Sequence, residues 1–380
     1  MGQLIATLSS YWDRIQATLF PQLEEELDLL TEKQQQLIAI LELVRIEEFL
    51  PDYRGYEGRP QKTRSAIARS FVAKMVYNLD TTTHLMERLQ TDKSLRRICG
   101  WESIRQLPSE STFSRAFADF ASTQLPQQVH QALVKNLLKD ELVLHNSRDS
   151  TAIEVREKAE RKVEKEEKPA KKKGRPKKGE ERPAAEPTRI EKQKTMTLEE
   201  MLKDLPTACD KGAKKDSKSN TMYWTGYKLH LDTIDGGIPV SAIVTSASIH
   251  DSQVALPLAA ITAKNIVNLY DLMDSAYDVP AIIEYTLSLG HVPLIDKNPR
   301  RDTELQKSIE MEAKARRTLN WAPAEETRYN ARTTAERANS RLKDEFGASK
   351  VRVRGHAKVT CHLMFGVLVL AADQLMKFVT

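Results

Sequence analysis

Four residues in the carboxyl-terminal part of the chain have side chains that could do chemistry together: Tyr329, Arg332, Glu336 and Lys343. Successive spacings of three, four and seven positions place them within an arc of roughly 60° on one helix, at about 100° per residue. One face of this predicted helix therefore carries a carboxylate, two cations and a phenol. A carboxylate flanked by Arg and Lys suits a metal ion that faces phosphate groups. An ordinary amphipathic surface helix would show the same pattern.

The spacing Tyr-x2-Arg-x3-Glu-x6-Lys resembles the signature of DDE transposases encoded by bacterial insertion sequences. That family also requires two upstream aspartates. Asp149 and Asp274 are candidates because each follows or ends an apolar segment typical of a strand. Outside residues 154–218 the resemblance covers most of the chain. Its further matches lie at residues 223–230, 248–253 and 293–299.

The resemblance implies that Asp149, Asp274 and Glu336 are the catalytic carboxylates and metal ligands. They are far apart in the sequence, so only folding at one edge of a sheet can bring them together. Three carboxylates cannot all stay charged in a dry cleft without cations, and oxygen ligands suit Mg²⁺ or Mn²⁺. We therefore expect two such ions, which can activate the attacking oxygen and stabilise the leaving oxygen of an in-line phosphodiester displacement.

The resemblance also implies that Arg332 and Lys343 bind DNA phosphates near the scissile bond and that Tyr329 approaches the same phosphate. Arg332 is the better bidentate partner for a phosphate, whereas Lys343 is a movable point charge. A purely structural alternative packs Tyr329 as an aromatic side chain and pairs Arg332 with Glu336 on the surface.

Acidic residues near these positions are expected to have structural roles. We expect Asp271 inside a strand and Asp278 at the start of a helix. The pair His250 and Asp251 could act in the site, but capping at the start of a helix is the commoner use of such a pair.

Composition excludes several classes of protein. The 380 residues are 40% hydrophobic and 29% charged, which is typical of a soluble protein with two or three domains. The longest apolar block, residues 365–372, is far shorter than a membrane span, so we expect no membrane contact and a cytoplasmic, nucleoid-associated protein. The three cysteines are far apart and show no CxxC spacing, so neither a disulfide framework nor a zinc site is indicated.

Positive charge is concentrated in one segment. Residues 154–194 hold 16 Lys or Arg against 10 Glu, whereas the formal net charge of the chain is only +5. We interpret residues 154–218 as a charged, flexible insert that attracts polyanions. Its Gly-Arg-Pro core at Arg175, followed by Lys177 and Lys178, resembles an AT-hook, which lies in the A·T minor groove. Nonspecific attraction to phosphates and a spacer without a binding role are the alternatives.

The first part of the chain, residues 1–140, has apolar positions at three- and four-residue intervals, which predicts a helical domain. Short helices joined by tight turns suit DNA binding, and related transposases use such a domain to recognise transposon ends. A helical bundle used only for packing or dimerisation is the alternative.

The rest of the chain combines strands and helices. The Asp-Gly-Gly turn at residues 235–237 predicts an antiparallel strand pair. The resemblance implies an α/β fold, a ribonuclease H-like mixed five-stranded sheet with flanking helices, formed by residues 141–153 and 219–380. The predicted strands are residues 142–153, 227–234, 238–245, 266–274 and 292–296.

Taken together, the resemblance predicts a transposase that binds the terminal inverted repeats of its insertion sequence as a homodimer or higher oligomer. It would cut double-stranded DNA at the ends and join them to target DNA. Two alternatives are a non-catalytic DNA-binding protein derived from a transposase and a ribonuclease H-like nuclease without strand transfer.

Overall fold

The computed structural model describes residues 2–51, 63–160, 187–215, 220–300, 302–319, 321 and 323–380. Arg175, Lys177 and Lys178 lie outside these residues, and so does the AT-hook-like segment that contains them.

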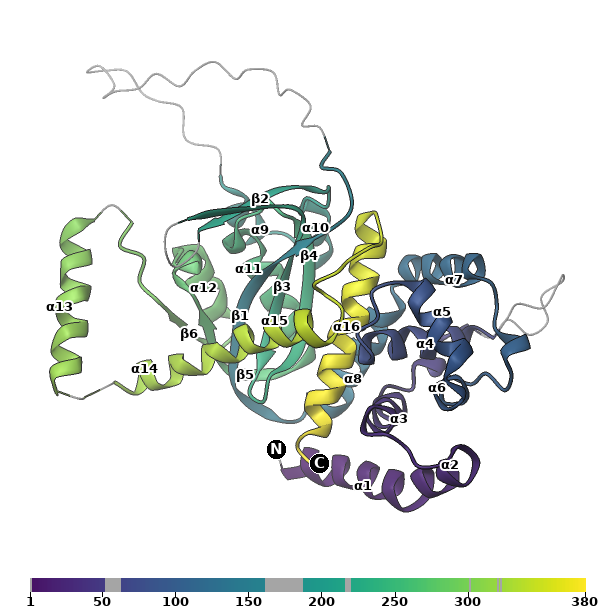
Figure 1. Cartoon of the computed structure of the whole chain (residues 1–380). Helices are drawn as coiled ribbons and strands as arrows, with labels where there is room; N and C mark the ends of the chain where they lie inside the picture. Colours follow the sequence, from purple (N-terminus) through teal and green to yellow (C-terminus); the bar gives the residue numbers. More distant parts are fainter. Residues whose placement is uncertain are drawn as a thin grey trace.

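The described residues before position 140 are mainly helical (Figure 1). Phe113, Phe117 and Phe120 face inward from one of these helices, and each packs against Phe71. The α-helices are α1 (Gly2–Arg14), α2 (Phe20–Leu27), α3 (Glu32–Val44), α4 (Arg64–Val76), α5 (Thr82–Thr91), α6 (Lys93–Ile98), α7 (Glu110–Ser122) and α8 (Leu125–Leu138). Shorter turns are η1 (Ile15–Leu19), η2 (Ile46–Phe49) and η3 (Ile104–Gln106).

Six strands form one sheet within the described residues: β1 (Leu142–Glu154), β2 (Asp210–Lys215), β3 (Thr221–Ile234), β4 (Ile238–Ser246), β5 (Val267–Met273) and β6 (Val292–Ile295). Five of them follow the order β4-β3-β1-β5-β6, with β3 antiparallel to β1 and β4, and with β1, β5 and β6 parallel. The turn between β3 and β4 contains Gly236 and Gly237, both with positive φ angles, as a tight hairpin requires. The predicted ribonuclease H-like fold is confirmed, and β2 extends it by pairing with the start of β3.

Helices cover both faces of this sheet (Figure 1). On one face, α15 (Thr333–Glu345) contacts β1 and β3, and α16 (His356–Met376) contacts β4. On the other face lies α11 (Ala255–Asn265), followed along the chain by α12 (Pro280–Ser288). Between β6 and α15, the helices α13 (Thr303–Leu319) and α14 (Ala324–Tyr329) form an arm, and no described side chain of α13 is buried.

The helix α16 joins the helical region to the sheet. It is apolar on nearly all sides and lies between β4 and the helices α3, α4, α7 and α8. Its Phe365 ring lies 5.8 Å from Phe71 and 6.3 Å from Phe117, measured between ring centroids. Among the described helices, α16 alone has the length and hydropathy of a membrane span, but 89% of that span is buried inside the protein. One continuous hydrophobic core therefore extends across the domain boundary that the sequence predicts.

The basic insert differs from the prediction in its second half. Residues 187–215 form α9 (Arg189–Gln193), α10 (Leu198–Asp204) and β2, whereas we expected a flexible segment through residue 218. Thr188 and Thr197 each begin a helix with a capping box, in which the side chain of a Glu three residues later bonds back to the cap. Ile190 and Met201 are buried against the sheet domain. Local caps and two apolar anchors thus outweigh the charged composition of this segment.

Candidate active site

Neighbouring parallel strands place two of the predicted carboxylates side by side. Ser147 of β1 is paired with Leu272 of β5, so Asp149 and Asp274, each two residues further on, reach the same level of the sheet. Asp274 is the first residue after β5 and caps the short turn η5 (Ser275–Tyr277), where its Oδ1 accepts a hydrogen bond from the backbone N–H of Ala276 at 2.9 Å. Asp149, inside β1, and Asp274, directly after the end of β5, therefore lie at a common acidic edge of the sheet.

The third carboxylate comes from the segment that the sequence predicts as one helix. That segment is divided, because Tyr329 ends α14, the turn η6 (Asn330–Arg332) is 3₁₀-helical, and α15 begins at Thr333. The Ala331 carbonyl in this turn accepts a hydrogen bond from the Ser147 hydroxyl of β1 at 3.3 Å. This contact ties the 3₁₀ turn to the strand that carries Asp149 and gives a physical reason for the break in the α-helix.

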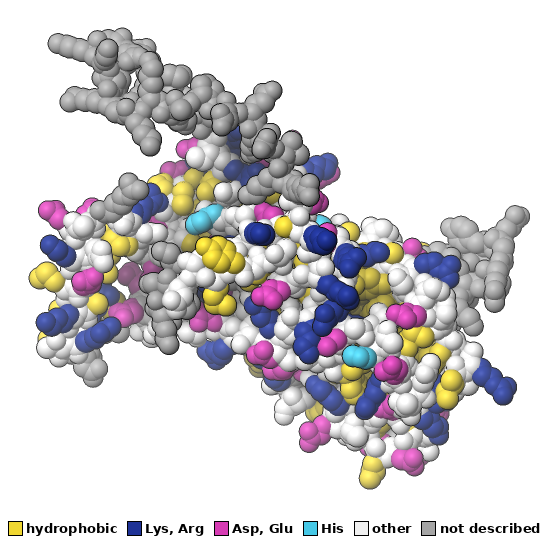
Figure 2. All heavy atoms as spheres, turned by 45° about the horizontal axis from the view of Figure 1, so that its top comes forward, with side chains coloured by type: hydrophobic (Ala, Val, Ile, Leu, Met, Phe, Trp, Pro, Cys, Tyr) yellow, Lys and Arg dark blue, Asp and Glu magenta, His cyan; other side chains and the backbone are white. Residues whose placement is uncertain are grey.

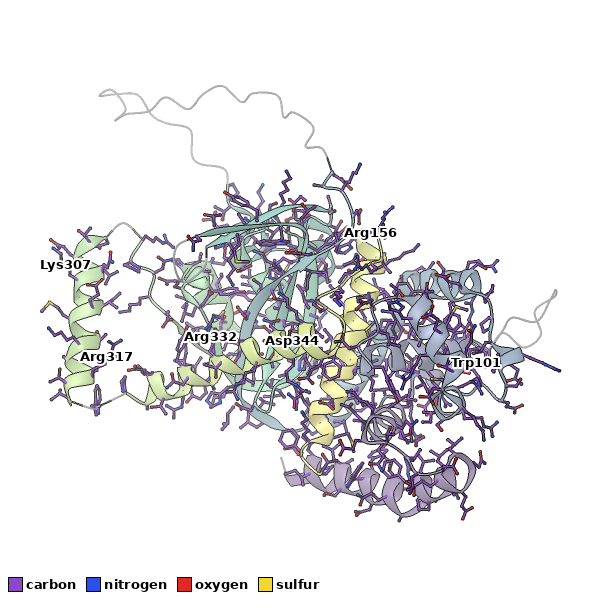
Figure 3. The ribbon with its side chains drawn as sticks, viewed as in Figure 1. Trp101, Arg156, Lys307, Arg317, Arg332 and Asp344 are labelled. Atoms are coloured by element: carbon purple, nitrogen blue, oxygen red, sulfur yellow. The ribbon has the colours of Figure 1, made fainter. Side chains whose placement is uncertain are left out.

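Arg332 lies between the three predicted carboxylates. Its Nη1 is 2.8 Å from Oε1 of Glu336, and its Nη2 is 3.9 Å from Oδ1 of Asp149 and 3.8 Å from Oδ2 of Asp274. Figure 3 labels Arg332 where α14 meets α15, next to the sheet. Folding thus brings these four residues of the predicted site together.

Burial dominates the electrostatics of the two aspartates. It raises the pKa of Asp149 and of Asp274, even though the charge of Arg332 opposes the rise in both cases. A single guanidinium therefore does not fully offset the cost of burying these two carboxylates. Such uncompensated carboxylate oxygens suit a hard divalent cation.

Within the described residues, no group of three or more His, Cys, Asp or Glu side chains is already arranged to hold a metal ion. The three carboxylates instead face the Arg332 guanidinium. Their chemistry still fits Mg²⁺ or Mn²⁺, since all the donors are carboxylate oxygens and a cation already lies between them.

Comparison with known proteins identifies the family. The family model described as "Transposase DDE domain" matches residues 147–371, which is more than half of the chain. The chain belongs to the DDE transposase family. A second model, "Transposase domain (DUF772)", matches residues 23–119 in the helical region. Comparisons with curated proteins and with solved structures gave no match.

Asn339 is a residue of the DDE domain that the sequence analysis missed. Its Nδ2 donates a hydrogen bond to Oδ2 of Asp149 at 3.0 Å, and its side chain is buried. The Asn339 Oδ1 finds no hydrogen-bond partner among the described residues. The available signal was spacing, because Asn339 follows Glu336 by three positions and so shares its side of α15.

Of the pair predicted to cap a helix, His250 forms the cap and Asp251 has another role. Capping of the turn η4 (Asp251–Val254) falls to His250, whose Nδ1 accepts a hydrogen bond from the Ser252 N–H at 3.4 Å. Asp251 instead pairs with Lys228 at 3.0 Å and lies 3.8 Å from His230. Burial alone would raise the pKa of Asp251, but these two neighbours hold it below its usual value. The DDE domain thus contains a second charged cluster on the opposite side of β1 from Asn339.

Tyr329 and Lys343 lie at the margin of the site. The Tyr329 hydroxyl donates to Oδ2 of Asp296, just after β6, at 2.7 Å, and burial together with this carboxylate raises the pKa of the phenol. Lys343 is half-buried on α15, and burial followed by the charge of Lys214 on β2 lowers its pKa. Lys214 is a cation near the site that the sequence analysis assigned to the flexible insert.

A buried polar network supports β1 beneath the acidic edge. Arg148 points to the opposite face from Asp149 and forms two hydrogen bonds with Asp232, at 2.8 and 2.7 Å. Asp232 also accepts a hydrogen bond from Thr262 of α11 at 2.6 Å. On the neighbouring strand Asp271 is a buried strand residue, as predicted. These bonds satisfy charges that would otherwise be costly inside the sheet and fix the strands that carry the site.

Proposed function

We propose that this protein is an active DNA transposase that binds the terminal inverted repeats of its insertion sequence, cuts the DNA and transfers the ends to a target. The observation that supports this most directly is the convergence of Asp149, Asp274 and Glu336 on one guanidinium at the edge of the sheet. A surface ion pair would need only one of these carboxylates. The set of three is what phosphodiester chemistry requires.

In this proposal Asp149, Asp274 and Glu336 hold Mg²⁺ or Mn²⁺, and a pair of such ions supplies activation of the attacking oxygen and stabilisation of the leaving oxygen. Asn339 keeps Asp149 oriented through its hydrogen bond to Oδ2. Arg332 offers its guanidinium to a DNA phosphate, for which its planar donors are well suited.

Lys343 and Tyr329 complete the phosphate-binding side of the proposed site. Lys343 contributes positive charge from α15, and the Tyr329 hydroxyl is held at the end of β6 by Asp296. Because burial keeps the Tyr329 proton in place at neutral pH, the phenol can donate a hydrogen bond but does not act as a base.

The proposed partners are transposon ends and target DNA, with the helical region contributing DNA recognition or dimerisation. Figure 2 shows Lys and Arg side chains gathered on one face of the molecule, which favours a polyanionic partner. We further propose a homodimer or higher oligomer in the cytoplasm, associated with the nucleoid. Arg175, Lys177 and Lys178 would add DNA contacts from the insert.

The test incubates the full chain with DNA that spans both flanks of its own gene, in Mg²⁺, Mn²⁺ or EDTA, and maps every cut and joined product. Asp274→Asn should abolish cutting, whereas Asp344→Asn, an exposed change on the same α15 helix as Glu336, should not. Metal-dependent cuts at a repeated terminal sequence, followed by joining, would support the proposal. DNA binding without cutting would favour a non-catalytic DNA-binding protein, and cutting without joining would favour a nuclease.

A further inference from the structure

A cluster of basic side chains lies where the end of β1 meets the start of α16. The backbone brings these segments together through a parallel bridge between Val155 and Val351. Residues 351–354 then alternate, with Val351 buried, Val353 partly buried, and both Arg352 and Arg354 exposed. We use the name basic stripe for four of the exposed cations of this region: Arg156, Arg352, Arg354 and Lys358.

The stripe carries positive charge that no ion pair among the described residues neutralises. Its four side chains form no ion pair with any acidic residue that the structure describes. The acidic neighbour Glu157 is turned inward, where Oε2 accepts hydrogen bonds from the Gly355 N–H at 2.7 Å and the Tyr227 hydroxyl at 3.3 Å. Like charges brought together at an anchored site cost free energy unless an anionic partner is present. The stripe is therefore suited to binding a polyanion.

The position of the stripe relates it to the candidate active site. Arg156 follows Asp149 by seven residues along the extended β1 and its continuation, a span of about 20–25 Å at roughly 3.3 Å per residue. Duplex DNA advances about 3.4 Å per base pair, so this span corresponds to about six or seven base pairs of a duplex that runs parallel to β1. Figure 3 shows Arg156 near the amino end of α16, well separated from Arg332, and Figure 2 brings that end of the molecule forward, where Lys and Arg side chains gather.

We propose that the basic stripe binds the phosphates of duplex DNA about six or seven base pairs from the scissile bond. This inference rests on the proposed transposase function, because it assumes that the scissile phosphate lies at Asp149. The stripe reads the backbone rather than the bases, since flexible arginine and lysine side chains on an open surface contact phosphates without regard to sequence. It is distinct from the helical region and from the AT-hook-like segment.

The test compares Arg352→Gln/Arg354→Gln with Lys192→Gln/Lys264→Gln in the full chain. Both variants lose two exposed cations, but the control pair lies on α9 and α11, away from the stripe. Fluorescence anisotropy would measure binding to two duplexes of equal length, one from the gene's own flank and one of arbitrary sequence. The salt concentration would vary between 50 and 300 mM, over which the Debye length falls from about 14 Å to about 6 Å. Thermal melting of each variant would verify that it is folded.

The stripe variant should bind both duplexes at least about tenfold more weakly near 150 mM salt. The negative slope of log K against log[salt] should become shallower by about 1.8, or about 0.9 for each lost phosphate contact. The control should keep the slope of the unmodified chain. An unchanged slope in the stripe variant would overturn the inference. Cutting of DNA with an unchanged slope would leave the proposed function standing without the stripe, whereas a reduced slope without any cutting would support the stripe and count against catalysis.

Discussion

Replacing one buried lysine should stabilise the protein in a pH-dependent way. Lys74 of α4 is only 4% exposed, and burial lowers its pKa from 10.5 to about 8. Keeping this group charged in the folded state at pH 7 therefore costs about 3 kcal/mol, at 1.36 kcal/mol for each tenfold change in proton affinity. Lys74→Met keeps most of the side-chain volume and removes that cost. We expect the free energy of unfolding to rise by about 1–3 kcal/mol at pH 7.

The sign of the pH dependence follows from the lowered pKa. Between pH 8 and 10.5 the unfolded chain holds the Lys74 proton more tightly than the folded chain does, so the unmodified protein gains stability from this group as the pH rises. The advantage of Lys74→Met should thus shrink by about 2.5 kcal/mol between pH 7 and pH 10. Urea unfolding at both pH values would measure it, with the exposed Lys93→Met as a control. Equal stabilisation at the two pH values, or none at pH 7, would refute the electrostatic reasoning.

Three further changes test other parts of the structure. Asn339→Ala should slow metal-dependent cleavage about tenfold with little change in DNA affinity, because Asp149 loses its orienting hydrogen bond. Single-turnover cleavage would measure the rate and fluorescence anisotropy the DNA affinity. Equal losses of rate and affinity would indicate a folding defect. Arg148→Met should lower the free energy of unfolding by about 3–5 kcal/mol, since Asp232 is left charged and buried; a loss below about 1 kcal/mol in urea unfolding would contradict this. Gly226→Ala should lower the thermal midpoint by several degrees, because φ is +151° and the new Cβ would lie 2.2 Å from a β1 carbonyl oxygen; an unchanged midpoint in calorimetry would count against it.

The sheet could be predicted because its signals are local. Strand-like apolar runs and the glycine turn at 235–237 define strands whose observed bounds differ from the prediction mostly by one or two residues, although β3 begins earlier, at Thr221. The spacing also indicated Arg332 and Glu336, which are joined by a hydrogen bond in the structure. Their roles in catalysis stay predictions.

The parts that were missed depend on contacts between distant segments. The strand β2 lies in a charged sequence, and its pairing with β3 places Gly212 against the Trp224 ring, which leaves no room for a side chain at that position. The hydrogen bond from Asn339 to Asp149 depends on the packing of α15 against β1, which the sequence pattern does not indicate. The central position of Arg332 likewise arises from the 3₁₀ turn that breaks the expected helix.

The central position of α16 has a consequence for how the protein is made. Gln36, in the third helix, donates a hydrogen bond to Asp373 of α16, which the ribosome adds 337 residues later. At roughly 5–20 residues per second, the helical region leaves the ribosome on the order of tens of seconds before its packing partner exists. During that time its apolar surface has no cover from α16, so the nascent chain is expected to depend on chaperones or on fast completion. The helical region, matched over residues 23–119, and the DDE domain thus reach their final packing together. An interrupted chain that stops before α16 should aggregate rather than compete for DNA.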